Sequence, residues 1–469
     1  MGNDLAAELR GAVGGAHVQA GADAPECRKD EALGASGVEP AFVVWPASAA
    51  EVAAVLRIAA SHRVPVTARG SGTGMSGGAI PGGGGVVVAF ARMNSIVEID
   101  AENHVAVVQP GVTLAELDAA AAGRSLVYPV FPGEMSASIG GTIATNAGGM
   151  RAVRYGVTRQ HVLGVEAVLA SGEVIRTGGK FVKCSTGYDL TQLIIGSEGT
   201  LALVTEATVR LYPRLPRQAT VLAPFGTLEQ ITAAVPVIIA SGLRPLVLEY
   251  VDMLTMAAIT EREDLDLGVP APVRERALAY LIVVLEERTD ERLAGELTTL
   301  AGLLGEAGAD DVYVLPDSAA RRLIDAREKA FWAAKAAGAN DIVDAVVPRA
   351  AMAAFLGEVA AVAGRRGGLV VGCGHAGDGN VHLAVFEADP VARSALMGDI
   401  FAAAAASGGA VSGEHGIGIT KKEYFRQLAH PGGLELMRRV KYAFDPLGIL
   451  NPGVLLDRPP GGSSPVPAG

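Results

Sequence analysis

Apolar and polar positions in the first part of the chain change in short segments, and glycines separate many of them. Residues 49–60 have the apolar spacing of a helix. Apolar runs of strand length recur at 64–68, 86–90 and 201–211. Thr113 and Glu116 have the spacing of a capping box, so we expect a helix from there to about Gly123. Residues 40–215 are therefore predicted to alternate strands with short helices.

The pattern after residue 217 is more regular. Strand-like runs lie at 219–224, 246–251, 279–285 and 312–315, and helical patterns lie at 228–240 and 291–307. This βαββαβ order is the ferredoxin-like arrangement. An arginine-rich helix near 319–335 and an apolar helix near 350–366 follow, and the last helix should end before Pro446. The expected fold class is α+β.

Prolines divide the chain at Pro213 and Pro216, and we place a domain boundary there. The expected parts are an N-terminal helix and loop, a glycine-rich domain, a second domain that begins ferredoxin-like and ends in a helical segment, and a disordered tail of Pro, Gly and Ser. They span 1–39, 40–216, 217–455 and 456–469.

The charge balance disfavours several kinds of partner. With 39 Lys and Arg against 50 Asp and Glu, the net charge of −11 repels nucleic acid and anionic membranes. No apolar run reaches the roughly 18 residues of a membrane span, and the first residues lack the parts of a signal peptide. We therefore expect a soluble cytoplasmic protein. Cys27, Cys184 and Cys373 lie too far apart for a disulfide framework or an iron–sulfur cluster.

A glycine-rich loop runs from Arg69 to Gly85. Gly72, Gly74 and Gly77 have the spacing of a Rossmann fingerprint, but the loop leads into a strand and opens no helix, so the Rossmann interpretation fails. Successive backbone N–H groups of such a loop can instead form a concave anion site. The alternative is a flexible linker, which the apolar strand on each side disfavours.

Three of the eight histidines lie in two clusters near the end of the chain. His375 and His382 are seven positions apart and would face opposite sides of one continuous strand. The Ala-Gly-Asp-Gly-Asn that follows His375 is a turn sequence, and a hairpin would bring its ends together. With Glu414 they would form a three-ligand metal site, and His415 would stay free for proton transfer. The alternative, histidines that only hydrogen-bond a turn, is disfavoured because the cluster also holds carboxylates.

Two further clusters of small residues, 132–149 and 196–200, follow the first loop. In this order the three clusters resemble the vanillyl-alcohol-oxidase or PCMH type of FAD-binding domain, over about 40–215. The resemblance implies that they hold the pyrophosphate, the flavin and the adenine side of FAD. The implied FAD-binding residues are Arg69, Gly70, Ser71, Gly72, Thr73, Gly74, Ser76, Pro132, Gly133, Ser136, Ser138, Gly140, Gly141, Asn146, Gly148, Gly149, Glu198, Gly199 and, near the end, Asn451. Some members tether FAD through a histidine of the first loop; this loop has none, so non-covalent FAD is expected.

The histidine clusters and the ending Lys441-Tyr-Ala-Phe-Asp-Pro446 resemble the family of D-lactate dehydrogenase, glycolate oxidase large subunit and D-2-hydroxyglutarate dehydrogenase. This resemblance covers nearly the whole chain. It implies that His375, His382 and Glu414 hold a divalent metal such as zinc, and that His415 is the catalytic base. Arg327 also matches, and its guanidinium suits a substrate carboxylate; by itself it would be a solvated helix charge. We expect Asn380 to orient the substrate.

Together these features predict an FAD-dependent dehydrogenase that oxidises a 2-hydroxy acid to the 2-oxo acid by hydride transfer to FAD, with help from the metal. One alternative is a non-catalytic FAD-binding electron-transfer subunit, which need not keep a metal cluster. Another is a metal-free flavin alcohol oxidase of the same fold, which an aromatic content of 5% disfavours. The acceptor stays open between a quinone, a cytochrome, a flavoprotein and an iron–sulfur subunit. A homo-oligomer, a complex subunit and a peripheral position at a membrane stay open as well.

The resemblance also bears on which acid is used. Members that oxidise a dicarboxylic hydroxy acid are expected to carry a lysine six residues before the proline that corresponds to Pro348. They are also expected to carry a small hydroxyl residue four positions after the arginine that corresponds to Arg327. This chain has Ile342 and Phe331 at those positions. A second carboxylate without a partner there would be costly. D-Lactate, glycolate or a modestly longer apolar D-2-hydroxy acid is therefore the expected substrate.

Overall fold

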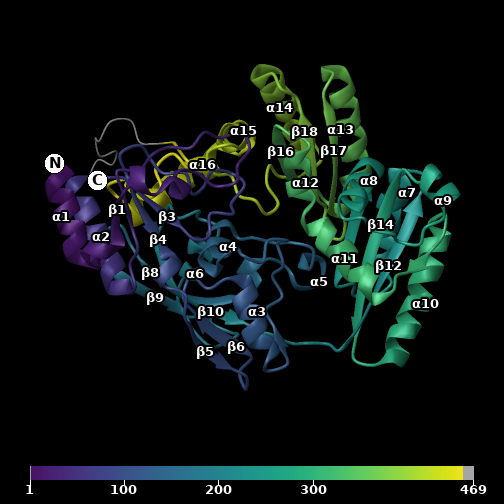
Figure 1. Cartoon of the computed structure of the whole chain (residues 1–469), viewed down its shortest axis with the longest axis horizontal. Helices are drawn as coiled ribbons and strands as arrows, with labels where there is room; N and C mark the ends of the chain where they lie inside the picture. The colour runs from purple at the N-terminus through teal and green to yellow at the C-terminus, as the bar shows by residue number, and fades with distance from the viewer. Residues whose placement is uncertain (1, 458–469) are drawn as a thin grey trace.

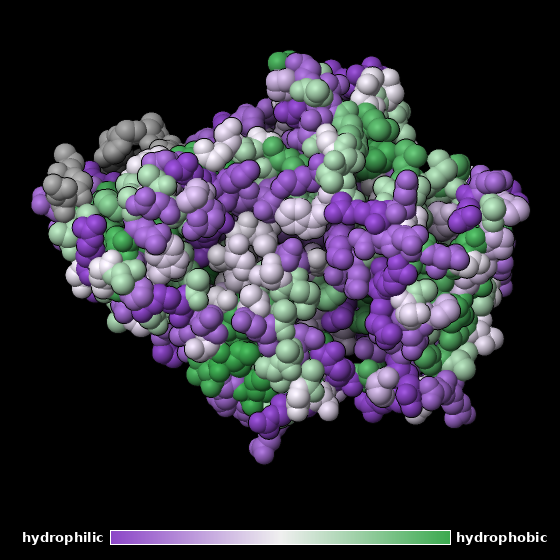
Figure 2. All heavy atoms as spheres, viewed as in Figure 1, coloured by the Kyte–Doolittle hydropathy of each residue, from purple (hydrophilic) through white to green (hydrophobic). Residues whose placement is uncertain are grey.

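The computed structural model describes residues 2–457, which form two lobes that lie side by side in Figure 1. One lobe contains β1 to β11, and the other is built on a sheet of seven strands. On the face shown in Figure 2, polar residues spread over both lobes and apolar residues gather in separate patches. None of the helices in residues 2–457 is long and apolar enough to cross a membrane.

The first lobe contains a four-stranded and a five-stranded sheet, in the orders β1-β2-β4-β3 and β5-β6-β10-β8-β9. Their strands are β1 (Val18–Ala20), β2 (Phe42–Val44), β3 (Val66–Arg69), β4 (Val86–Ala89), β5 (Ile96–Asp100), β6 (Val105–Val108), β8 (Val162–Val168), β9 (Val174–Gly178) and β10 (Leu203–Arg210). A short pair, β7 (Leu126–Val127) with β11 (Tyr212–Pro213), completes the lobe. The N-terminal loop thus contributes a strand, because β1 pairs with β2.

The helices of this lobe are short. They are α1 (Gly2–Val13), α2 (Ala49–His62), α3 (Leu114–Ala122), α4 (Ile139–Thr145), α5 (Ala152–Tyr155) and α6 (Leu190–Ile194). The capping box predicted at Thr113 and Glu116 is confirmed, and it begins α3. The alternation of strands and short helices is confirmed too, although the segments of β5, β6, β8 and β9 were not singled out from the sequence.

The second lobe begins with the predicted ferredoxin-like unit. Its elements are β12 (Arg217–Phe225), α7 (Leu228–Ala240), β13 (Val247–Asp252), β14 (Ala279–Glu287), α10 (Asp290–Glu306) and β15 (Tyr313–Val314). The strands lie in the order β15-β12-β14-β13, in which the fourth strand of the unit neighbours the first and the third neighbours the second. Two helices that the pattern did not predict, α8 (Met253–Arg262) and α9 (Ala271–Arg276), lie between β13 and β14 in the chain.

The chain then repeats this unit. Its elements are β16 (Asp341–Val346), α13 (Met352–Arg366), β17 (Leu369–His375), β18 (Asn380–Phe386) and α14 (Pro390–Ala406), followed by bridges from Ala410 and Ser412 to β16. The order β17-β18-β16 with those bridges mirrors that of the first unit. β13 and β17 pair antiparallel and join both units into one sheet, which is larger than the predicted one.

Helices cover both faces of this sheet. α7, α10, α13 and α14 pack one apolar core against one face. α8, α11 (Asp317–Glu328) and α12 (Ala330–Ala336) lie on the other face, beside the strands that join the two units. The predicted arginine-rich helix is therefore two helices, and α11 ends where the backbone changes direction at Lys329.

The end of the chain returns to the first lobe. α15 (Lys422–Leu428) and α16 (Pro431–Phe444) lie there in Figure 1, and α16 ends before Pro446 as predicted. Leu450 bridges to Val66 of β3, and Ile449 and Leu450 are buried in the same core as that strand. Of the tail predicted to be disordered, 456–469, Leu456 is buried and the residues from 458 onward lie outside the described residues.

Phe401 offers a test of the second core, because its side chain is fully buried between α13 and α14 and the sheet. Phe401→Ala should lower the free energy of unfolding by about 3–5 kcal/mol, since it leaves a cavity in a packed core. A urea titration followed by circular dichroism measures this. Phe181→Ala removes a phenyl ring that is 48% exposed and should leave the midpoint close to that of the unchanged protein. Equal shifts for both variants would contradict the assigned core.

Candidate active site

The loop after β3 has unused backbone donors. Among the described residues, the backbone N–H groups of residues 71–75 find no hydrogen-bond acceptor. Gly72 has a φ of 77°, which favours glycine, and a Cβ on Gly70 would lie 2.1 Å from the Ser138 hydroxyl oxygen. Ser71 is exposed and residues 72–75 are half-buried, so these N–H groups are open to a ligand, and a concave row of such donors is suited to an anion.

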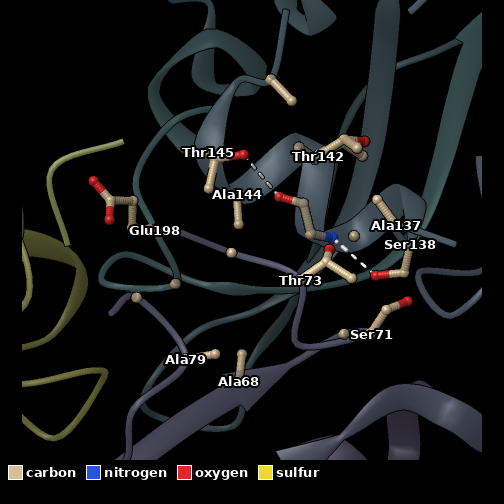
Figure 3. A pocket seen from close by; sticks show the side chains of 18 of the residues that line it. Ala68, Ser71, Thr73, Ala79, Ala137, Ser138, Thr142, Ala144, Thr145 and Glu198 are labelled. Atoms are coloured by element: carbon tan, nitrogen blue, oxygen red, sulfur yellow. Dashed lines mark hydrogen bonds between the residues drawn. The ribbon is translucent and has the colours of Figure 1, made fainter. Parts of the chain in front are cut away.

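A cavity of about 180 Å³ lies between this loop and the start of α4. Ser138 caps α4 because its hydroxyl oxygen accepts from the N–H of Gly141. Figure 3 shows Ser71, Thr73 and Ser138 gathered at one side of the cavity, with Glu198 at the other. Small side chains dominate the lining, so a flat ligand can approach the backbone on both sides.

Most of the residues expected to bind FAD line this first cavity. Those in its wall are Gly70, Ser71, Gly72, Thr73, Gly74, Ser76, Pro132, Ser138, Gly140, Gly141, Glu198 and Gly199. Gly133 lines a neighbouring cavity instead. The others expected there do not line the first cavity: Arg69, Ser136, Asn146, Gly148, Gly149 and Asn451.

These remaining residues hold the loops. Arg69 donates to the carbonyl of Lys29, and the Asn146 side chain accepts from the N–H of Arg159 beyond the end of α4. The carbonyl of Ser136 accepts from the Ser71 hydroxyl. Gly149 has no room for a side chain, because a Cβ would lie 1.8 Å from the Phe131 carbonyl oxygen.

Asn451 connects the end of the chain to the first cavity. Its amide nitrogen donates to the carbonyls of Gly78 and Glu198, and its amide oxygen accepts from the Thr67 hydroxyl. The carboxylate of Glu198 in turn accepts from two backbone N–H groups, at 417 and 418. Burial raises the pKa of Glu198 to about 6. This network positions the cavity wall without adding Asn451 to it.

The predicted hairpin between the first two histidines is present. β17 and β18 pair antiparallel, with Cys373 opposite His382 and His375 opposite Asn380. Alternation along β18 turns Val381, Leu383 and Val385 into the core and leaves His382 on the opposite face. The centroids of the His375 and His382 rings lie 4.7 Å apart. The turn therefore brings together two side chains that one strand would separate.

The three histidines converge on one carboxylate oxygen. The Nε2 atoms of His375 and His382 each lie 3.2 Å from Oε1 of Glu414, and Nε2 of His415 lies 3.8 Å from it. A tetrahedral ion with ligands at about 2.0–2.1 Å separates them by about 3.3 Å, which the observed spacing fits. His375, His382 and Glu414 therefore form a donor set suited to a divalent cation.

Two buried carboxylates lie beside the other ring nitrogens. Oε1 of Glu249 lies 2.6 Å from Nδ1 of His375, within hydrogen-bond distance, whereas Oδ1 of Asp344 lies 3.6 Å from Nδ1 of His382, beyond it. A partner such as Glu249 fixes a histidine ring and keeps its other nitrogen directed at a metal. Glu249 was missed in the sequence, although a lone carboxylate within the apolar run 246–251 signals a buried partner. Lys421, 3.5 Å from Asp344 and 3% exposed, was also missed.

The electrostatics of the cluster favour an anionic Glu414 and a neutral His415. Burial alone would raise the pKa of Glu414, but His375 and His382 hold it well below its usual range. Burial lowers the pKa of His415 to about 4. At pH 7 this ring is therefore unprotonated and can accept a proton.

Asn380 differs from the expectation that it orients the substrate. It is 4% exposed and lines neither cavity. Its amide nitrogen donates to Asp344 and to the carbonyl of Ala345. A side chain bound in this way positions Asp344, and through it the histidines, without reaching a substrate.

A second cavity, of about 250 Å³, lies beside the first and is lined by Arg327, Phe331 and Ile342. Nη2 of Arg327 lies 2.6 Å from Glu249. Both cavities share four lining residues: Met75, Pro132, Glu414 and His415. The histidine cluster therefore stands at the wall between the two cavities.

The sequence and the fold can be compared with known proteins. Residues 40–178 match the family model of the FAD binding domain, and residues 214–455 match that of the C-terminal domain of FAD linked oxidases. The chain is 55% identical to an uncharacterized FAD-linked oxidoreductase of Mycobacterium tuberculosis, over 97% of this chain and 99% of that protein. It is 39% identical to a D-lactate dehydrogenase of Archaeoglobus fulgidus, over 88% and 90%.

Among solved structures, p-cresol methylhydroxylase with bound substrate has a similar fold. Its TM-score is 0.77 at 18% identity, with 97% of each chain covered. The expected PCMH-type fold and the expected family are thus confirmed. This chain belongs to the family of FAD-linked oxidases.

Proposed function

We propose that this FAD-linked oxidoreductase is a dehydrogenase that oxidises a 2-hydroxy acid of the D-lactate or glycolate type to the 2-oxo acid. The observation that supports it most is that Glu414 and His415 line both cavities. Groups that can activate a hydroxyl thus lie where a substrate in the second cavity would meet a flavin in the first. The relative from Archaeoglobus fulgidus, a D-lactate dehydrogenase, agrees with this reaction.

Arg327 is the proposed partner of the substrate carboxylate. Its side chain is 7% exposed and lines the second cavity, and its Nε has no hydrogen-bond partner within residues 2–457. A guanidinium group suits a carboxylate because it donates two parallel hydrogen bonds. Glu249 holds the other side of the guanidinium group and so fixes its direction.

His415 is the proposed proton acceptor. Its neutral ring borders both cavities, and its backbone N–H donates to Asp344, which holds this part of the loop. When bound, FAD would take up the C2 hydride and a separate acceptor would remove its electrons, while a divalent cation held by His375, His382 and Glu414 would lower the pKa of the substrate hydroxyl. We place the enzyme in the cytoplasm.

The FAD is proposed to be non-covalent, because no histidine or cysteine is among the residues of the loop at 70–85. The purified protein should be yellow, and acid precipitation should release its flavin into the supernatant. Absorbance spectra of pellet and supernatant measure the distribution. Flavin that stays with the pellet would show a covalent bond.

The metal assignment is tested by His382→Ala. Loss of one of the three ligands should remove the stoichiometric metal and lower kcat by at least about a hundredfold, while FAD remains. Elemental analysis and the flavin spectrum measure both. His104→Asn removes an exposed imidazole from the first lobe and is the control. If the protein without substitutions binds no stoichiometric metal, the proposed role of the metal is wrong.

Within residues 2–457, Arg327 is the one lysine or arginine that lines the substrate cavity, which predicts a preference for monocarboxylates. Ile342 and Phe331 line the cavity, and Lys335 pairs with Glu31 at 2.5 Å and is not in its lining. D-2-Hydroxyglutarate should therefore have a kcat/KM at least about tenfold below that of D-lactate. Ile342→Lys should narrow this gap, because it adds a partner for the distal carboxylate. A wild-type preference for the dicarboxylate would overturn the assignment of the cavity.

A further inference from the structure

The second cavity has a polar end and a much longer apolar part. Its polar end contains Arg327 and the cluster of His375, His382, Glu414 and His415. The rest of its lining comes mostly from alanine and larger apolar side chains of three strands and two helices. Glycolate and lactate would occupy only the polar end.

Strand register shows how the apolar part is arranged. His382 lies on the face of the sheet that lines the cavity. Two residues further along β18, on the same face, Ala384 forms a row with its direct cross-strand neighbours Val371 and Ile342. The row after it consists of Leu369 and Phe386. At about 3.3 Å per residue, this last row lies about 13 Å beyond His382 along the strands. All five side chains line the cavity.

The opposite wall is formed by α8 and α12. α12 contributes the small side chains of Ala330, Ala333 and Ala334, and Ala337 directly follows the helix. These side chains leave space above the strands. α8 contributes larger apolar groups, among them Leu254 and Ile259. Leu254 and Leu369 are each 50% exposed, so the apolar part opens to the surface.

No group in this apolar part could pair with a second charge. Arg327 is the one lysine or arginine among the lining residues, and it lies at the polar end. A second carboxylate there would lose its hydration without gaining a partner. Apolar carbon, in contrast, would be stabilised by leaving water.

We infer that the substrate is a 2-hydroxy acid with an apolar tail, such as a medium-length alkyl chain or an aryl group, that extends from C2 past Val371 and Ile342 toward Leu369 and Phe386. This inference rests on the proposed function and names the substrate class of the same site. Arg327 binds the substrate carboxylate, and the histidine cluster faces C2. The tail contacts the two rows of apolar side chains on the strands. Each buried methylene should improve binding about fourfold.

A series of racemic acids tests the inference: glycolate, lactate, 2-hydroxybutyrate, 2-hydroxyhexanoate, 2-hydroxyoctanoate and phenyllactate. Dye reduction by the FAD-loaded protein should show kcat/KM rising with the apolar tail, chiefly through a lower KM, because the tail is bound equally in ground state and transition state. A maximum at glycolate or lactate would overturn the inference and leave the proposed function standing. Reduction by none of the acids would contradict both.

Ala334→Leu provides a second measurement, because it fills the space above the strands. The ratio of kcat/KM for 2-hydroxyoctanoate to that for lactate should fall at least tenfold. Ala336→Leu is the matched control, since Ala336 lies on the same helix, is exposed and is not in the cavity lining. Its ratio should match that of the unchanged protein. Flavin content reports on folding, and an unchanged ratio in a flavin-loaded Ala334→Leu protein would contradict the proposed tail position.

Discussion

Two carboxylates buried within one sheet determine the rest of the site. Glu249 and Asp344 are fully buried, and a carboxylate in such a place must be paired and hydrogen-bonded. Glu249 is bound by His375 and Arg327, while Asp344 is bound by Asn380, Ser412 and the backbone of the loop that carries Glu414. Of these partners, His375 and Arg327 line the second cavity, and the loop bound by Asp344 carries Glu414, which lines both cavities. The need to compensate two buried charges thus fixes the orientation of the reactive groups.

The repeat in the second lobe explains how these charges meet. Glu249 lies on the second strand of the first unit, and His375 lies on the second strand of the next. Because β13 and β17 pair antiparallel with Tyr250 opposite Gly374, these two side chains become cross-strand neighbours. Asp344 and His382 face each other in the same way across β16 and β18. The site therefore lies where the two ferredoxin-like units join, and neither unit alone contains it.

The sequence predicted the features that depend on neighbouring residues and missed those that depend on distant ones. The capping box at Thr113, the hairpin after His375 and the first βαββαβ unit have local signals, and the structure contains all three. The pairing of β13 with β17 joins segments about 120 residues apart, and no periodicity reports on such a contact. The contact of Glu249 with His375 depends on that pairing. For this reason the histidines could be selected from the sequence, whereas Glu249, which orients His375, could not.

The two lobes also share hydrogen bonds at the site itself, so the flavin cavity and the histidine cluster are coupled. Ser76, in the first glycine loop, donates to the carbonyl of Gly416, directly after His415. Glu198 accepts from the next two backbone N–H groups, and Asn451 holds the backbone of Glu198. A Cβ on Gly148 would lie 2.8 Å from Glu414, so that glycine permits the close approach. A residue that only holds these loops can therefore change the distance between C2 of a substrate and the flavin, and hydride transfer depends steeply on such a distance.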